Sequence, residues 1–225
     1  MSKLFVAGCS VSDYTSVNKV YGEYLSEKLE YDYVHEAAAC GSNWRIWRKI
    51  GNHIINGTLT SKDLLIVQYT TIERKEFWSQ IESGYYDKKY SYRDKYIPNN
   101  GYLPEGDIIR FKFSSYDGQS NSKEKKFLKM CENFINPVYE REIFDIQHLM
   151  FQSLLKDNNI KTIFLGYYLN KDVDFTLTSY FENSYVSVNE IKNMNEYTID
   201  NGGHFSELGH LYTSNKLYDF IMNGK

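Results

Sequence analysis

Residues 63–69 read Asp63-Leu64-Leu65-Ile66-Val67-Gln68-Tyr69, and this stretch carries the clearest strand signal in the chain. Four aliphatic residues in a row, closed by polar residues at both ends, are typical of a strand that is buried on both faces. Strands of this kind occur in parallel sheets that helices cover on both sides. The stretch therefore favours an α/β protein.

The residues before this strand alternate strand and helix signals. The apolar run Leu4–Ala7 predicts a first strand, and Tyr33–Ala38 predicts a weaker second one. Between these strands, Val20–Leu29 places its apolar residues at helical spacing, and Trp44–Ile55 does the same after the second strand. This alternation predicts a parallel sheet whose strands are joined by crossover helices.

The pattern resumes in the last third of the chain. A helical stripe covers Arg141–Lys156, and Lys161–Gly166 predicts a further buried strand. Tyr185–Val188 is a candidate short strand, and Ser206–Met222 predicts a strong C-terminal helix. A chain of 225 residues with this pattern predicts one α/β domain over 1–225.

The segment 76–140 differs from the rest. It is polar, rich in Tyr, Lys and Ser, and it contains all three prolines. A structureless stretch of this length is abnormal in a compact domain, so we expect an insertion or lid with some helix around Lys123–Phe134. Many of the 21 tyrosines fall here. They indicate either a surface for a substrate or partner, or the codon usage of an AT-rich genome.

The composition excludes several classes of function. Hydrophobic residues make up 42% of the chain, enough for a core, so a disordered chain is excluded. The formal net charge of -3 offers no basic field for nucleic-acid phosphates. We find neither an apolar run as long as a membrane span nor a signal peptide, which predicts a cytoplasmic protein, a viral or phage product included. The three cysteines suit a reducing compartment and show no metal-ligand spacing, so we expect neither a metal nor another cofactor.

Three polar segments lie where open α/β sheets carry their sites, beyond the ends of strands. They are Gly8-Cys9-Ser10, Gly41-Ser42-Asn43 and the run 200–210. In the second segment, Ser42 or Asn43 is also well placed to cap the following helix.

A serine hydroxyl becomes nucleophilic when a base takes its proton and a carboxylate orients that base. Ser10, His204 and Asp200 are residues of the required types. Backbone N–H groups can bind the oxyanion that develops on the substrate, and those of Ser10 and Gly41 are the candidates.

The order of these segments resembles the SGNH hydrolases, also called the GDSL esterase and lipase superfamily. The Gly-Asp-Ser block of that family corresponds to Gly8-Cys9-Ser10, and its glycine after the second strand corresponds to Gly41. Its final His-Pro-Ser-x-x-Gly-His block corresponds to His204–His210, which reads HFSELGH. The resemblance implies a flavodoxin-like three-layer α/β/α fold with a parallel sheet of about five strands. It also implies ester or acyl chemistry by Ser10 and His204, with Asp200 orienting His204.

The chain departs from the family at three places. Cys9 replaces an Asp that is not the nucleophile. Asp200 precedes His204 by one residue more than usual, and Asn201 stands at the customary spacing, so either a bulged turn presents Asp200 or a Ser–His dyad remains. The family's third block supplies an oxyanion-binding Asn, but residues 69–74 read YTTIER and contain none. Thr71, Arg74 and Asn43 are candidate replacements, and Thr71 is the oxyanion donor we predict.

Further residues are assigned by their position in the predicted fold. The segment Arg74–Trp78 follows the third strand toward the expected rim of the site, so Arg74, Trp78 and Asn43 are predicted to bind substrate. Some of the candidate residues also have a purely structural interpretation. Ser10 could be a turn residue, Cys9 suits a small buried apolar group better than a nucleophile, and His210 suits a structural role within its helix.

The sequence therefore predicts a serine hydrolase of SGNH type that cleaves an ester. Family habit and the aromatic content favour an O-acyl group on a carbohydrate. The partners expected are a small-molecule or glycan ester and no nucleic acid, and a homo-oligomer is compatible with the sequence. Two alternatives stay open: an O-acyltransferase that uses the same residues, and a catalytically weak or inactive binding or assembly module whose Tyr-rich insertion carries the interaction.

Overall fold

The structure is a computed structural model. It describes residues 1–14, 17–38, 41–70, 74–79, 92–96, 106–112, 137–166, 185–188, 190–191, 196–199 and 204–224. The predicted helix at Lys123–Phe134 and the candidate site residues Thr71, Asp200 and Asn201 lie outside these ranges.

The centre of the protein is a five-stranded parallel sheet. Its strand order is β2-β1-β3-β7-β8, and every neighbouring pair is parallel. The strands are β1 (Lys3–Ala7), β2 (Asp32–His35), β3 (Leu64–Gln68), β7 (Lys161–Gly166) and β8 (Tyr185–Ser187). The predicted α/β fold with about five parallel strands is thereby confirmed.

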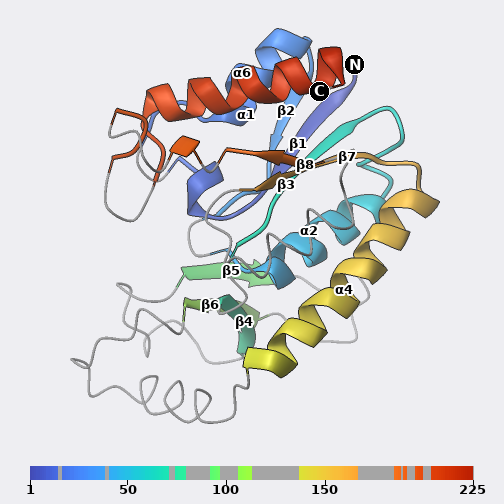
Figure 1. Ribbon diagram of the computed structural model, residues 1–225. Coiled ribbons are helices and arrows are strands. Elements are labelled where there is room, and N and C mark those ends of the chain that lie inside the picture. Colours follow the sequence, from blue (N-terminus) through green and yellow to red (C-terminus); the bar gives the residue numbers. More distant parts are fainter. Residues whose placement is uncertain are drawn as a thin grey trace.

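Helices cover both faces of this sheet and make three layers (Figure 1). One face carries α1 (Tyr21–Leu29) and α6 (Glu207–Asn223), which also pack against each other. The opposite face carries α2 (Asn43–Ile55) and α4 (Pro137–Asp157). The chain moves from β1 to β2 and then back past β1 to β3, and right-handed crossovers in opposite directions place their helices on opposite faces.

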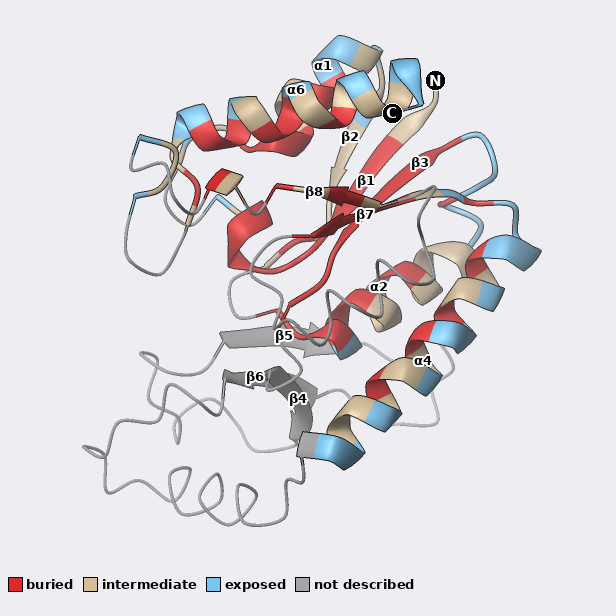
Figure 2. Ribbon diagram, in the orientation of Figure 1, coloured by how far each residue is buried: buried red, intermediate tan, exposed pale blue. Residues whose placement is uncertain are grey.

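The buried strands explain why two separate cores form. Successive side chains of a strand point to opposite faces, so each apolar strand supplies both cores. Leu4 and Val6 join the cluster beneath α1 and α6, whereas Phe5 and Ala7 join the cluster beneath α2 and α4. Leu64–Val67 divides in the same way, and Figure 2 shows β1 and β3 as almost wholly buried. This pattern is why their sequences are continuous apolar runs.

Two serine caps fix the helices that begin at the carboxyl edge of the sheet. The Ser42 hydroxyl accepts a hydrogen bond from the Arg45 N–H at 3.1 Å and starts α2, which settles the choice between Ser42 and Asn43. The Ser206 hydroxyl accepts from the Gly209 N–H at 3.2 Å and starts α6. Each cap satisfies a backbone donor that the first turn of a helix leaves unpaired.

Part of the segment predicted as an insertion is a second sheet. β4 (Arg74–Ser79), β6 (Gly106–Lys112) and β5 (Tyr92–Tyr96) pair antiparallel in the order β4-β6-β5. The sequence did not predict these strands, because residues such as Tyr92-Arg93-Asp94-Lys95-Tyr96 are too polar to show a buried face. α4 begins at Pro137, inside the predicted range 76–140, and the assignment of that range as a lid stays a prediction.

In the part of the chain that the structure describes, no helix is both long enough and apolar enough to span a membrane.

Candidate active site

Ser10 and His204 meet at the carboxyl edge of the sheet although 194 residues separate them. The Ser10 Oγ lies 3.0 Å from the His204 Nε2, the distance of a hydrogen bond. Ser10 opens a short 3-10 turn, η1 (Ser10–Ser12), directly after β1, and it is 9% exposed. The structure therefore brings together the two residues that the sequence pattern paired.

Backbone pairing holds His204 in place. The His204 carbonyl accepts from the Ile199 N–H at 2.9 Å, and Thr198 forms an antiparallel bridge with Phe205. Phe205 is buried in the core under α6, so it anchors the residue directly after His204. Whether Asp200 or Asn201 stands beside the second ring nitrogen of His204 stays a prediction, because both residues lie outside the described ranges.

The turn at Ser10 leaves one backbone donor without an acceptor in the described part of the chain. The Ser12 N–H donates to the Cys9 carbonyl at 3.0 Å and closes the turn. Among the residues that the structure describes, the Ser10 N–H has no acceptor. An N–H in this position can donate to charge that develops on a substrate oxygen.

Gly41 lies against the backbone that precedes Ser10. A Cβ at Gly41 would stand 2.8 Å from the Gly8 carbonyl oxygen and 3.5 Å from the Cys9 Cα, so only glycine fits here. The Gly41 N–H itself donates to the Ala38 carbonyl at 2.9 Å. Its predicted oxyanion role therefore requires this amide to change partners when substrate binds.

The Asn43 side chain bonds the main chain just after β3 through both its oxygen and its nitrogen. Its Oδ1 accepts from the Thr70 N–H and its Nδ2 donates to the Thr70 carbonyl, both at 2.9 Å. Both residues are buried. Asn43 thus ties the first turn of α2 to β3, and its predicted contact with substrate stays untested. Arg74 and Trp78 belong to β4, and their predicted contacts with substrate are likewise untested.

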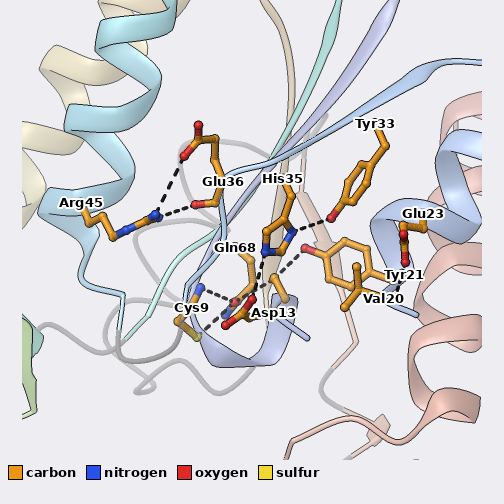
Figure 3. A network of polar contacts seen from close by, with 11 residues as sticks. Cys9, Asp13, Val20, Tyr21, Glu23, Tyr33, His35, Glu36, Arg45 and Gln68 are labelled. Carbon is orange, nitrogen blue, oxygen red and sulfur yellow. Dashed lines mark hydrogen bonds and ion pairs between the residues drawn. The ribbon is translucent and has the colours of Figure 1, made fainter. Parts of the chain in front are cut away.

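Sequence reasoning missed a buried polar network between Gln68 and the residues on either side of Ser10 in the sequence, and Figure 3 shows Gln68 beside Cys9. The Gln68 Oε1 lies 3.3 Å from the Cys9 N, 3.2 Å from the Cys9 Sγ and 3.1 Å from the Ser12 Oγ. The Ser12 hydroxyl also bonds the Tyr21 hydroxyl at 2.8 Å. The available signal was a polar residue, Gln68, at the end of an otherwise aliphatic strand.

A second series of hydrogen-bonded side chains connects the turn to β2. The Asp13 carboxylate accepts from the His35 Nε2 at 3.0 Å, and the His35 Nδ1 lies 2.9 Å from the Tyr33 hydroxyl (Figure 3). Burial raises the pKa of the Tyr33 hydroxyl, so Tyr33 stays protonated and donates to His35. This series fixes the residue that follows η1 to the end of β2.

Two further ionisable groups near this edge, Glu36 and His210, have structural partners. Burial alone would raise the pKa of Glu36, but His53, Lys49 and Arg45 outweigh it and lower that pKa. Burial lowers the pKa of His210 to about 3, and its neutral Nδ1 accepts from the Tyr21 N–H at 3.1 Å. His210 therefore has the structural position that its place in the helix suggested.

The fold and the site together define a class of protein. It has a three-layer α/β fold and a serine–histidine pair at the carboxyl edge of its sheet. The chain is similar to the crystal structure of the psychrotrophic esterase EstA from a Pseudoalteromonas species, inhibited by monoethylphosphonate. The TM-score is 0.54 over 99% of this chain and 97% of that one, at 9% identity. A structure from Desulfitobacterium hafniense, assigned to the G-D-S-L family of lipolytic proteins, matches with a TM-score of 0.49 over 97% and 98%, also at 9% identity. No protein-family model and no curated protein matches the sequence significantly. The likeness to EstA establishes a shared fold.

Proposed function

We propose that the protein is a serine esterase of the SGNH type, with Ser10 as nucleophile and His204 as general base and acid. The observation that carries this proposal is the 3.0 Å contact between the Ser10 Oγ and the His204 Nε2 at the carboxyl edge of a parallel sheet. A base at this distance can take the hydroxyl proton during attack.

The reaction follows from these groups. The Ser10 Oγ attacks the ester carbonyl while its proton passes to the His204 Nε2, and the Ser10 N–H donates to the oxyanion that forms. Collapse of the tetrahedral intermediate breaks the bond to the alcohol, which leaves with the proton from His204. Water then attacks the acyl-enzyme, with His204 as base, and releases the acid. Asp200 is the residue proposed to orient His204, and Gly41 and Thr71 are the further proposed oxyanion donors.

The fold supports the same chemistry. The similar Pseudoalteromonas protein is an esterase that a phosphonate inhibits. Phosphonates of this kind modify activated serine hydroxyls and imitate the tetrahedral intermediate. A phosphonate is therefore the natural probe for Ser10.

The proposed substrate is an O-acyl group on a carbohydrate. Trp44 follows Asn43 in the first turn of α2 and is 46% exposed, and its ring packs edge-on against Trp47 at 6.1 Å. An exposed indole held in this way suits stacking on a sugar ring. Arg74 and Trp78 of β4, together with Asn43, are the other residues proposed to line the substrate site.

Covalent labelling tests the nucleophile directly. A fluorophosphonate should add one phosphonyl group to Ser10, detected by peptide mass spectrometry, and the protein should hydrolyse p-nitrophenyl acetate and an acetylated monosaccharide. Ser10→Ala should abolish both results, and His204→Ala should slow both by about 10³-fold or more.

The matched control is Ser26→Ala, which removes another buried serine, on α1, whose hydroxyl donates to the Glu23 carbonyl. This variant should label and turn over as the wild type does. Absence of labelling in the wild type, or undiminished labelling in Ser10→Ala, would overturn the proposal. A sugar alcohol added as acceptor separates hydrolysis from acyl transfer, because transfer yields a new ester in place of the free acid.

A further inference from the structure

The Gln68 side chain holds the turn that contains Ser10. Its side-chain oxygen faces three donor atoms, two on Cys9 and one on Ser12, at 3.1 to 3.3 Å. Cys9 and Ser12 lie on either side of Ser10 in the chain, so one side chain at the end of β3 anchors both ends of the nucleophilic turn.

The chemistry of its neighbours fixes the orientation of the Gln68 amide. The Gln68 Nε2 donates to the Tyr69 carbonyl at 2.7 Å, and a carbonyl can only accept. The Cys9 N–H can only donate, so the oxygen must face Cys9. A flipped amide would set two donors against each other and two acceptors against each other.

The network is buried. Gln68 is 1% exposed, and Cys9, Ser12 and Tyr21 are buried as well. A bond that is lost here leaves an unpaired buried group, which is costly. The Tyr21 hydroxyl extends the network to α1 through its bond to Ser12.

Gly8 provides the space for this arrangement. A Cβ at Gly8 would lie 2.7 Å from the Ser12 Oγ and 3.1 Å from the Gln68 Oε1, so any side chain would push the two groups apart. A side chain at position 8 would therefore displace the Ser12 hydroxyl from its contact with Gln68.

We infer that Gln68 is a positioning residue for catalysis, which sets the Ser10 hydroxyl against His204 by holding Cys9 and Ser12. Gln68 does not touch the substrate in this role, so its loss should lower kcat and leave KM nearly unchanged. The inference rests on the proposed function for its kinetic readout. A displacement of about 1 Å at a nucleophile costs on the order of 100-fold in rate.

The test is Gln68→Met, which keeps the shape of the side chain and removes its hydrogen bonds. We expect the rate of Ser10 labelling by a fluorophosphonate, and kcat for p-nitrophenyl acetate, to fall about 10- to 100-fold. In a double-mutant cycle with Ser12→Ala, the combined loss should be smaller than the product of the single losses, because both changes break the same contact.

Asp63→Ala is the matched control, because Asp63 joins the same two strands at their opposite ends. Its Oδ1 accepts from the Lys3 N–H at 2.8 Å, and its Oδ2 accepts from the Thr60 N–H at 2.8 Å. This variant should lower the melting temperature without slowing the labelling of Ser10. If Gln68→Met labels as fast as the wild type, or if both variants slow in proportion to their loss of thermal stability, the inference is wrong.

A structural readout separates this inference from the proposed esterase activity. The ¹⁵N signal of the His204 ring reports its bond to Ser10 and should change in Ser10→Ala. Gln68→Met should reproduce that change even if the wild type shows no esterase activity or labelling. A wild-type His204 signal in Gln68→Met contradicts the inference. Should Gln68→Met fail to fold, Cys9→Ala removes the Sγ donor and Ser12→Ala removes the Oγ donor, while the backbone N–H of residue 9 stays in place, and both variants are judged by the same two readouts.

Discussion

At the scale of single residues, the turn that carries Ser10 depends on close backbone packing. Gly41 touches the Gly8 carbonyl and the Cys9 backbone, and Gly8 leaves room for Gln68 and Ser12. These contacts surround Ser10 with groups that have little freedom to move. Interiors packed this closely respond to the addition of one carbon atom.

Gly41→Ala tests this packing. The added Cβ would stand 2.8 Å from the Gly8 oxygen and 2.9 Å from the Ala38 oxygen, both backbone atoms. We expect the free energy of unfolding to fall by about 1–3 kcal/mol and the labelling of Ser10 to slow. Urea denaturation and phosphonate labelling measure the two effects.

Gly51→Ala is the control for that substitution. Gly51 lies within α2, and a Cβ added there would meet no atom of the described residues within 4 Å outside its own helix backbone. This change should stabilise the protein by about 0.5–1 kcal/mol, since alanine favours a helix. Equal effects of the two substitutions would show that the contacts of Gly41 do not matter.

At the scale of elements, Asn43 connects α2 to β3. Its side-chain amide bonds both the N–H and the carbonyl of Thr70, so it pairs with the main chain in place of a neighbouring strand. The end of β3 is thereby paired by a side chain from a helix. Because β4 follows only a few residues later, this contact also fixes where the chain leaves the main sheet.

Asn43→Ala should destabilise the protein strongly. It leaves the buried N–H and carbonyl of Thr70 without partners, so we expect a loss of about 2–4 kcal/mol in the free energy of unfolding, measured with urea. Ser42→Ala is the comparison, because it removes only the cap bond from the Arg45 N–H and should cost about 1 kcal/mol. A loss in Asn43→Ala no larger than that in Ser42→Ala would contradict this role.

The elements also show what could be predicted from the sequence. The central strands were predictable, because apolar runs such as Leu64–Val67 are typical of strands in a sheet that is covered on both faces. The meeting of Ser10 and His204 was predictable from the order of the polar segments. The strands β4 and β5 were not, because their sequences show no regular alternation of apolar and polar residues, and in β6 the alternation is limited to Ile109-Arg110-Phe111-Lys112.

The roles of two amide side chains could not be predicted either. Gln68 reaches Cys9 across 59 residues of sequence, and Asn43 reaches Thr70 across 27. Such contacts depend on the assembled fold and leave no periodic signal. A polar residue at the carboxyl edge suggested a substrate contact for Asn43, which stays a prediction, and it gave no sign of the bonds to the main chain of Thr70.

At the scale of the whole molecule, two buried histidines make stability depend on pH. Burial lowers the pKa of His148 to about 4, and it lowers that of His210 to about 3. In the unfolded chain both would titrate near 6.5. Between these values the unfolded state binds more protons than the folded state, so stability falls as the pH falls below about 6.5.

From pH 7 to pH 5, each of these histidines should reduce the free energy of unfolding by about 2 kcal/mol. Urea denaturation at several pH values measures the slope. His148→Gln keeps an acceptor for the Tyr69 hydroxyl, which lies 2.7 Å from the His148 Nδ1, and should remove about half of this pH dependence. An unchanged slope would show that His148 does not titrate as its burial predicts.

Asp63 and Gln68 stand at opposite ends of β3, and each bonds the neighbouring β1 segment. Continuous aliphatic strands can slide past one another by two residues and still bury the same faces. Here such a slide would separate Asp63 from the Lys3 N–H and Gln68 from the Cys9 N–H at once. The two polar side chains therefore favour the native register of β1 and β3. A shifted register would bury the same apolar side chains but would leave these hydrogen bonds unmade.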